Sequence, residues 1–159
     1  MSLRFKLNLL AQRVLSSSLY IEKKKIASID RGILALVGIE KSDTSSDCKF
    51  IADKLLNYRI FPDDKGRMEK SVLDVKGDVL LVPEVTLAIA TRKGTRPSFS
   101  EAANPDLGKK LFNELSNKIR EIHDKLEVGI FGADMEINLI NDGPVTFLFK
   151  STDSKKNLD

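Results

Sequence analysis

The sequence predicts an α+β fold with an antiparallel or mixed sheet, because many short strand-like segments accompany two segments of helical periodicity. The chain has 159 residues, of which 42% are hydrophobic and 31% are charged, as is typical of one globular domain. The clearest strand is the apolar run "GILALVGI" at 32–39, which favours burial on both faces of a sheet.

Glycine, proline and polar clusters separate the remaining strand-like segments. The first of them are expected to form a hairpin with Lys23 to Lys25 at its tip. Proline lacks the N–H group that a sheet ladder needs, so Pro83 is expected to interrupt its segment. The expected strands lie at 9–14, 18–22, 25–29, 57–61, 77–91, 128–140 and 145–149.

The first expected helix begins near Asp43, Thr44 or Ser45, any of which can cap it. Cys48 lies on its apolar stripe and is therefore expected to be a buried small hydrophobe rather than a nucleophile. The acidic side chains of this segment are expected to form a cap and a solvated face. These acidic residues are Asp43, Asp47 and Asp53.

The second expected helix has Asn104 as its cap and Pro105 in its first turn. One face stays apolar from Leu107 to Ile122, which is the pattern of an amphipathic helix. The single histidine, His123, follows this pattern and is expected to be exposed at the helix end, where a cation meets the negative end of the dipole.

The inventory of reactive side chains is small. A single histidine that is expected to be exposed at a helix end cannot build a Ser-His-Asp triad or a metal site, and there is no Cys/His pair at metal spacing, no P-loop and no dinucleotide-binding glycine motif. An enzyme of this sequence would work without metal or cofactor. The net charge of +3 is only mildly basic. No apolar run approaches the roughly 20 residues that span a bilayer, so the expected compartment is the cytoplasm.

Three segments contain residue choices that serve neither core packing nor simple turns, at 83–103, 129–135 and 141–146. Glycines in the last two allow a close approach of the backbone to a ligand, and free N–H groups there can hold an oxyanion. Gly143-Pro144 separates two β-favouring stretches, and the pattern alone is also compatible with an ordinary turn.

Six blocks in collinear order resemble the D-aminoacyl-tRNA deacylases, formerly called D-tyrosyl-tRNA deacylases. The resemblance runs from about Leu9 to Phe149, and the residues before about Leu7 look like an extension relative to the family. The blocks are "QRV" at 12–14, "NYRIF" at 57–61, "SVLDV" at 71–75, "TRKGTRPSF" at 91–99, "FGADM" at 131–135 and "NDGPVT" at 141–146.

The resemblance implies one domain at 1–150 with a β-barrel-like core and flanking helices, followed by a polar tail at 151–159. It also implies a homodimer with active sites at the subunit interface and no membrane association. Members hydrolyse the ester that joins a D-amino acid, or glycine, to the terminal adenosine of tRNA. They release the free amino acid and reusable tRNA, which is chiral proofreading in translation.

The resemblance also implies roles for particular residues of the substrate site. Gly143 and Pro144 would share a cis peptide bond and enter the active site of the other subunit, where their carbonyl groups leave no room for an L side chain. Phe131, Gly132 and Met135 would border the adenosine pocket.

Thr86 is the expected catalytic side chain, as an orienting group rather than a nucleophile, since no base is identifiable beside it. The resemblance implies that the ribose 2′-hydroxyl of the substrate assists. The backbone N–H groups of Val85 and Thr86 are expected near the scissile carbonyl. Arg92, Lys93 and Arg96 are expected to bind tRNA phosphates or to organise their loop.

The sequence departs from the family block Ser-Gln-x-Thr-Leu at Pro83 and Glu84. If Glu84 points into the pocket, it would favour the α-ammonium group of the substrate; alternatively it points away. This departure leaves a second interpretation open, namely a catalytically impaired protein that binds the tRNA acceptor end. A general esterase without nucleic acid is a weaker third alternative, which the missing triad disfavours.

Overall fold

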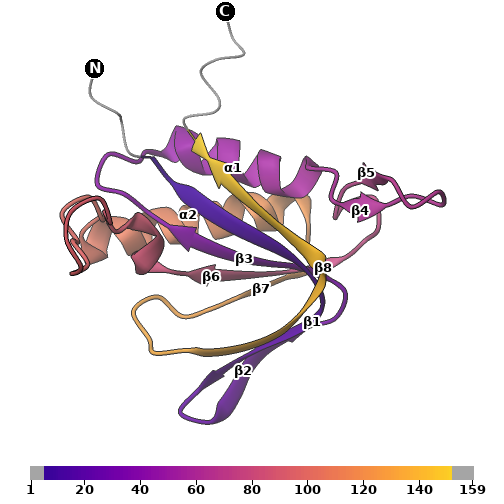
Figure 1. The fold of residues 1–159 in the computed structure, drawn as a ribbon, viewed down its shortest axis with the longest axis horizontal. Coiled ribbons are helices and arrows are strands. Elements are labelled where there is room, and N and C mark those ends of the chain that lie inside the picture. The colour runs from indigo at the N-terminus through magenta and orange to yellow at the C-terminus, as the bar shows by residue number, and fades with distance from the viewer. Residues whose placement is uncertain (1–5, 152–159) are drawn as a thin grey trace, which may run out of the picture.

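A computed structural model describes residues 6–151, and its main feature is a mixed sheet that curls into a nearly closed barrel (Figure 1). The strand order is β2-β1-β3-β6-β7, and β8 pairs with β1. The strands are β1 (Asn8–Ile21), β2 (Lys24–Ile29), β3 (Gly32–Gly38), β6 (Asp78–Pro83), β7 (Leu126–Val128) and β8 (Glu136–Lys150). The α+β fold with a barrel-like mixed sheet is thereby confirmed.

Two amphipathic helices, α1 (Ser45–Asn57) and α2 (Pro105–Ile122), pack against the sheet and against each other. The expected caps are present: Thr44 forms a capping box with Asp47, and the Asn104 side chain accepts a hydrogen bond from the N–H of Leu107 at 2.9 Å. Cys48 is completely buried, as expected. The helices and the sheet share one main hydrophobic core.

The longest strands differ from the expected ones. The segments at 9–14 and 18–22 are one strand, β1, whose register against β8 shifts near Val14. Such irregularities increase the bend of a strand, which allows β1 to pair with three neighbours around the barrel. The segment expected at 128–140 is divided, because β7 ends at Val128 and β8 begins at Glu136.

Two further expected strands are wrong. Of the segment 57–61 only Phe61 is in a strand, the short β4 (Phe61–Pro62), which pairs with β5 (Met68–Lys70). Tyr58 instead ends α1, and its ring packs edge-on against Phe149 at a centroid distance of 4.8 Å. After Pro83 the chain forms a 3₁₀ turn, η1 (Val85–Ala88), rather than a second strand.

Smaller corrections concern the hairpin tip, the histidine and the tail. The tip is Glu22-Lys23, both with positive φ, and Lys24 already belongs to β2. His123 is buried rather than exposed, and its Nε2 lies 2.7 Å from the carbonyl oxygen of Gly77. Of the tail expected at 151–159, residues 152–159 lie outside the described part, whereas Ser151 is buried. Residues 1–5 of the expected extension also lie outside it. No described helix is long and apolar enough to cross a membrane.

Candidate functional site

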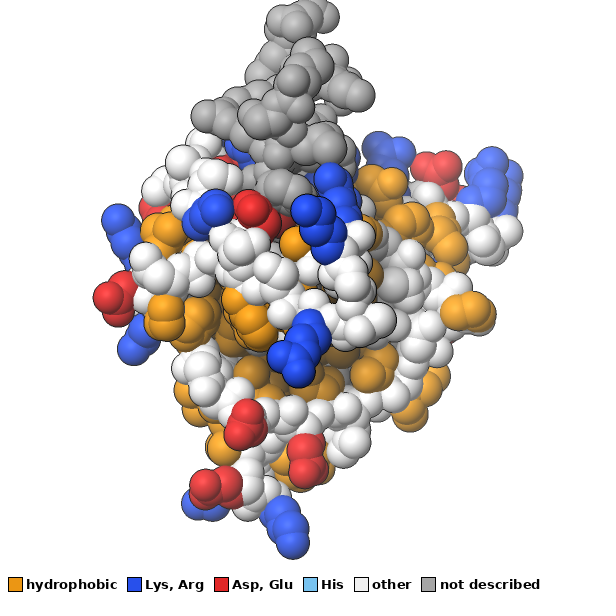
Figure 2. Space-filling model, turned by 60° about the vertical axis from the view of Figure 1, so that its left-hand side comes forward, with side chains coloured by type: hydrophobic (Ala, Val, Ile, Leu, Met, Phe, Trp, Pro, Cys, Tyr) orange, Lys and Arg blue, Asp and Glu red, His pale blue; other side chains and the backbone are white. Residues whose placement is uncertain are grey.

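Two of the three segments singled out from the sequence meet on one side of the molecule, at the left of Figure 1: the segment that contains η1 and the loop 89–104, and the turn 129–135. A Cβ atom placed on Gly129 would lie 3.0 Å from Sδ of Met135 and 3.2 Å from Cδ of Pro83. The turn 129–135 therefore packs directly beside the residue that precedes Glu84. Figure 2 shows this side turned forward, with hydrophobic side chains in a hollow across the face and Lys and Arg side chains above it.

The η1 turn is held against the end of β3 by backbone contacts. The N–H of Glu84 donates to the carbonyl oxygen of Val37 at 2.8 Å. Gly38 lets the turn approach closely, because a Cβ there would lie 2.7 Å from Cβ of Leu87. Asn8 donates from Nδ2 to the carbonyl oxygen of Leu87 at 3.4 Å. The exposed Thr86 is thus presented on a fixed support.

Glu84 caps its own turn, an arrangement that the two sequence-based alternatives did not include. Its Oε1 accepts hydrogen bonds from Thr86 Oγ1 and, at 3.2 Å, from the Thr86 N–H. The carboxylate therefore fixes the hydroxyl group expected to orient the substrate. It also occupies one of the two backbone amides expected near the scissile carbonyl, so that only the amide of Val85 remains of that pair.

Phe131, Gly132 and Met135 lie together on the turn 129–135, although two of them also pack inside the protein. The Phe131 ring contacts Phe112 at a centroid distance of 6.4 Å, and Met135 packs against a second hydrophobic cluster. Gly132 has a φ of +82°, which an L side chain rarely adopts. This turn is therefore a well-anchored wall beside η1.

Arg92, Lys93 and Arg96 are exposed on the loop 89–104. An isolated bridge between Ala90 and Ser98 closes the loop. Sequence reasoning gave no separate role to Phe99, yet its side chain is 58% exposed on the same loop. An exposed aromatic side chain beside cations is the composition of surfaces that bind single-stranded nucleic acid.

Gly143 and Pro144 lie in the middle of β8, far from η1 along the barrel, and their peptide bond is cis, as the resemblance implies. Asn141 pairs with Val14 of β1, whereas Asn8, six residues earlier in β1, pairs with Gly38 beneath η1. Six residues of strand span about 20 Å. Within one chain the structure therefore does not bring Gly143-Pro144 to Thr86.

The segment 141–145 is held by two side chains. Arg13, which is 9% exposed, donates from Nη1 to the carbonyl oxygen of Ile60 at 2.7 Å and forms an ion pair with Asp142 at 3.1 Å. Asn141 donates from Nδ2 to the carbonyl oxygens of Arg13 and Val145, both at 3.0 Å. The exposed Gly143-Pro144 dipeptide thus projects from a rigid base. From the sequence, Arg13 was included only as a member of the "QRV" block, and no role was assigned to its side chain.

A buried carboxylate cluster beneath η1 corrects the expectation for Asp43 and Asp47, whereas Asp53 is exposed, as expected. Asp43 accepts hydrogen bonds from the N–H groups of Leu7 and Glu40, both at 2.7 Å, and Asp47 pairs with Lys6 at 3.0 Å. Glu40 accepts from Asn8 Nδ2 at 3.0 Å, the same amide that contacts η1. Burial, reinforced by the charge of Asp43, raises the pKa of Glu40 to about 7, and burial raises the pKa of Asp43 to about 6.

Replacing Glu40 with glutamine is expected to make protein stability less dependent on pH. The folded protein binds the Glu40 proton more tightly than the unfolded chain, so wild-type stability falls as the pH rises from about 4.5 to about 7. The Glu40→Gln variant has no ionisable group at this position, so its stability does not fall in this way as the pH rises. It should match the wild type near pH 4 and be more stable by about 3 kcal/mol at pH 8, as measured by denaturant unfolding. Glu69→Gln, at an exposed position, is the control, and a pH-independent difference for Glu40→Gln would contradict this account.

Within residues 6–151 no group of three or more His, Cys, Asp or Glu side chains is placed to hold a metal ion.

Comparisons with a family model and with curated proteins identify the same family. The model of the family described as D-Tyr-tRNA(Tyr) deacylase matches residues 10–150. A D-aminoacyl-tRNA deacylase of Francisella tularensis subsp. tularensis (strain WY96-3418) is 48% identical over 139 residues, covering 87% of this chain and 96% of the relative. One of Teredinibacter turnerae (strain ATCC 39867 / T7901) is 50% identical over 145 residues, covering 91% of this chain and all of the relative, 100%.

Solved structures share the fold. The c-Myc DNA Unwinding Element Binding Protein superposes with a TM-score of 0.86 at 32% identity, over 90% of this chain and 97% of that one. A probable eukaryotic D-amino acid tRNA deacylase superposes with a TM-score of 0.80 at 16% identity, over 91% and 99%.

Proposed function

Because this chain belongs to the D-Tyr-tRNA(Tyr) deacylase family and hydrolyses the ester bond of D-aminoacyl-tRNA, we propose that its active site is built from the η1 turn of one subunit and the Gly143-Pro144 segment of another. The observation that carries this proposal is the separation of about 20 Å between these two parts within one chain. A second copy supplies the missing part, with Gly143-Pro144 as the element that excludes L side chains.

Exposed apolar side chains on β1 and on β8, the strand that contains Gly143, support a homodimer. They lie on β1 and β8, which are paired antiparallel to each other. Large exposed apolar groups gathered on one region are typical of an interaction surface. These side chains are Leu15, 51% exposed, Leu139, 37% exposed, Ile140, 56% exposed, and Leu148, 50% exposed.

In the proposed mechanism water attacks the ester carbonyl while the protein positions the substrate. The Val85 N–H faces the developing oxyanion, and Thr86, held by Glu84, orients the ester. The substrate ribose 2′-hydroxyl assists proton transfer, while Glu84, the carboxylate among the described hydrogen-bond partners of Thr86, accepts from the N–H and hydroxyl groups of that residue. Phe131, Gly132 and Met135 border the adenosine.

Thr86→Ala is expected to lower kcat for D-tyrosyl-tRNA by about tenfold without abolishing it, because it removes an orienting contact and leaves the backbone in place. Single-turnover kinetics would measure this loss. Ser28→Ala, which removes an exposed hydroxyl from β2, is the control. Complete inactivation, or an acyl-enzyme trapped on Thr86 of the wild type, would instead assign nucleophilic catalysis to this residue.

Deacylation of three substrates tests the proposed function: D-tyrosyl-, L-tyrosyl- and glycyl-tRNA. We expect hydrolysis of the D-tyrosyl and glycyl esters only, since both lack a side chain in the L position. Binding without turnover would favour the impaired acceptor-end binding protein suggested by Pro83 and Glu84. Cleavage of small esters without tRNA would favour a general esterase. The proposed compartment is the cytoplasm, where charged tRNA is used.

Arg92, Lys93 and Arg96 are proposed to contact tRNA phosphates, since the whole segment from Thr91 to Ser100 is exposed beside η1. Phosphate contacts release counterions, so kcat/KM should fall steeply with salt concentration. The triple alanine variant should show a flatter salt dependence, and an unchanged slope would contradict phosphate binding by these side chains.

A further inference from the structure

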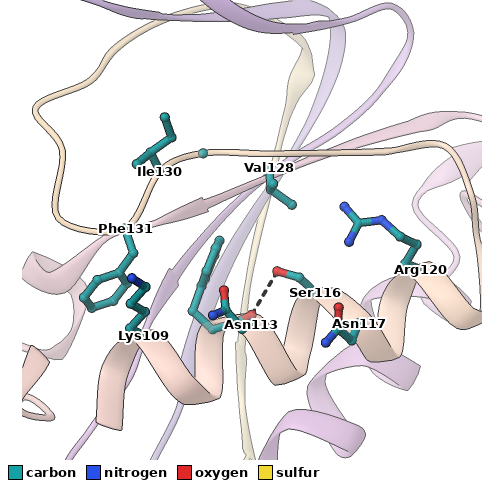
Figure 3. Close-up of a pocket in the computed structure, with 10 residues that line it drawn as sticks. Lys109, Asn113, Ser116, Asn117, Arg120, Val128, Ile130 and Phe131 are labelled. Atoms are coloured by element: carbon teal, nitrogen blue, oxygen red, sulfur yellow. Dashed lines mark hydrogen bonds between the residues drawn. The ribbon is translucent and has the colours of Figure 1, made fainter. Parts of the chain in front are cut away.

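A groove of about 440 Å³ separates α2 from the segment 128–131 (Figure 3). Its helix wall consists of side chains that recur at helical spacing along one edge of α2. These are Lys109, Phe112, Asn113, Ser116, Asn117 and Arg120. The opposite wall is apolar and contains Val128, Ile130 and Phe131. Apart from Phe112, the helix wall of the groove is therefore polar, whereas the opposite wall is hydrophobic.

The polar wall is positively charged and carries no carboxylate. Lys109 and Arg120 lie near the two ends of the groove, and no Asp or Glu is among the residues that line it. Neither cation forms a salt bridge within residues 6–151. They are eleven positions apart on the helix, which is about 16 Å along the axis. The groove thus presents two cations at a spacing suited to an extended polyanion.

Between the cations, Asn113 and Asn117 present exposed amide groups that can donate and accept hydrogen bonds. Ser116 is buried, and its hydroxyl donates to the carbonyl oxygen of Phe112 at 2.9 Å. The two asparagines are therefore the polar groups best placed to meet base or ribose edges. Ile130, which is 47% exposed, provides an apolar surface opposite them.

The groove is continuous with the candidate active site. Phe131 both lines the groove and belongs to the turn proposed to border the adenosine. Gly129, another lining residue, packs beside Pro83 and Met135. From this shared end the groove follows α2 toward Arg120 (Figure 3). A single-stranded nucleic acid whose last nucleotide lies at η1 would therefore run along this groove.

We propose that this groove binds the single-stranded nucleotides that precede the terminal adenosine of the tRNA acceptor end, an inference that rests on the proposed function. Lys109 and Arg120 contact phosphates, Asn113 and Asn117 contact base or ribose edges, and the 128–131 wall packs against the bases. Cations along a groove with an apolar face are the means by which proteins hold single strands with little sequence preference.

The test compares two substrates that share the ester but differ in the upstream nucleotides: D-tyrosyl-tRNA and 3′-O-D-tyrosyl-adenosine. The Lys109→Ala/Arg120→Ala variant should lose kcat/KM on the tRNA substrate, mainly through KM, and retain it on the adenosine ester. Removing two single-strand phosphate contacts should flatten the salt slope by about 1.4. The wild-type to variant ratio should then shrink about sevenfold between 50 and 200 mM salt.

Two further variants sharpen the test. Asn113→Ala/Asn117→Ala should raise KM for tRNA without changing the salt slope, because amides contact no counterion-bearing charge. Lys49→Ala/Lys110→Ala removes the same net charge from exposed positions outside the groove and should leave the slope near the wild-type value.

Equal activity of the Lys109→Ala/Arg120→Ala variant and the wild type on tRNA would overturn the groove proposal. So would an equal loss on both substrates, because the groove would then act on the site rather than on the nucleotides. Wild-type protein that cleaves neither substrate would refute the proposed function itself.

Discussion

Gly143→Ala is expected to reduce kcat/KM for D-tyrosyl-tRNA by at least about a hundredfold, because misplacement of a positioning group by about 1 Å has that effect. A Cβ on Gly143 would lie 2.2 Å from the backbone N of Val145 and 2.7 Å from its Cγ2. The backbone of the segment must therefore move. Gly143 and Pro144 are exposed, but Val145 belongs to the main core, so some loss of stability should accompany the loss of activity. Initial rates with D- and L-tyrosyl-tRNA would measure the loss, together with the thermal unfolding midpoint.

The matched control is Gly66→Ala. Gly66 lies in the exposed turn before β5, has a φ of +78° and has no heavy atom within 4 Å of its added Cβ. Alanine there should cost about 1 kcal/mol of stability through left-handed backbone and leave deacylation unchanged. If Gly143→Ala were as active as Gly66→Ala, the segment 141–146 would have no part in the reaction.

Helix periodicity and capping residues predicted α1 and α2 well, since both depend on residues within a few positions of one another. The burial of Cys48 follows from the same local pattern. The continuity of β1 was not predictable in this way, because its length is stabilised by three partner strands that come from both ends of the chain. The segment at 57–61 has a β-favouring composition, but packing of Tyr58 against β8 decides its conformation.

In the candidate site, as in the fold, features that depend on neighbouring residues could be predicted, whereas features that depend on residues far apart in the sequence could not. The resemblance identified Thr86, Gly143 and Pro144, but only the strand register shows that one chain keeps them about 20 Å apart. Asp43 and Asp47 resembled an ordinary helix cap. Their partners at positions 6 and 7 are more than 35 residues away in sequence, and no local pattern indicates such burial.

The role of Glu84 was also beyond sequence reasoning. The family block suggested that a carboxylate in this position either reaches the substrate or points into solvent. In the structure it binds Thr86, two residues later, which is possible because η1 is a tight turn rather than the expected strand. The departure at Glu84 is thereby compatible with an ordered Thr86.

Gly38→Ala is expected to impair the other half of the proposed site to a similar extent. Its Cβ would lie 2.7 Å from Cβ of Leu87 and 2.9 Å from the backbone N of Ala88, so η1 must move away from β3. We expect a loss of about a hundredfold in kcat/KM and about 1–3 kcal/mol in stability. Gly77→Ala crowds the other end of β3 and β6 with contacts of 3.2 Å, and it should be less stable yet active.

Mixing the two inactive variants gives the sharpest expected result. If each site combines η1 of one subunit with Gly143-Pro144 of the other, a heterodimer of Gly38→Ala and Gly143→Ala contains one intact site and one doubly altered site. Random pairing makes half of the dimers mixed, so co-refolding at equal amounts should restore about a quarter of wild-type activity. Each variant refolded alone is the control. If tagged heterodimers form and yet remain as inactive as their parents, both halves of the site must act within a single chain.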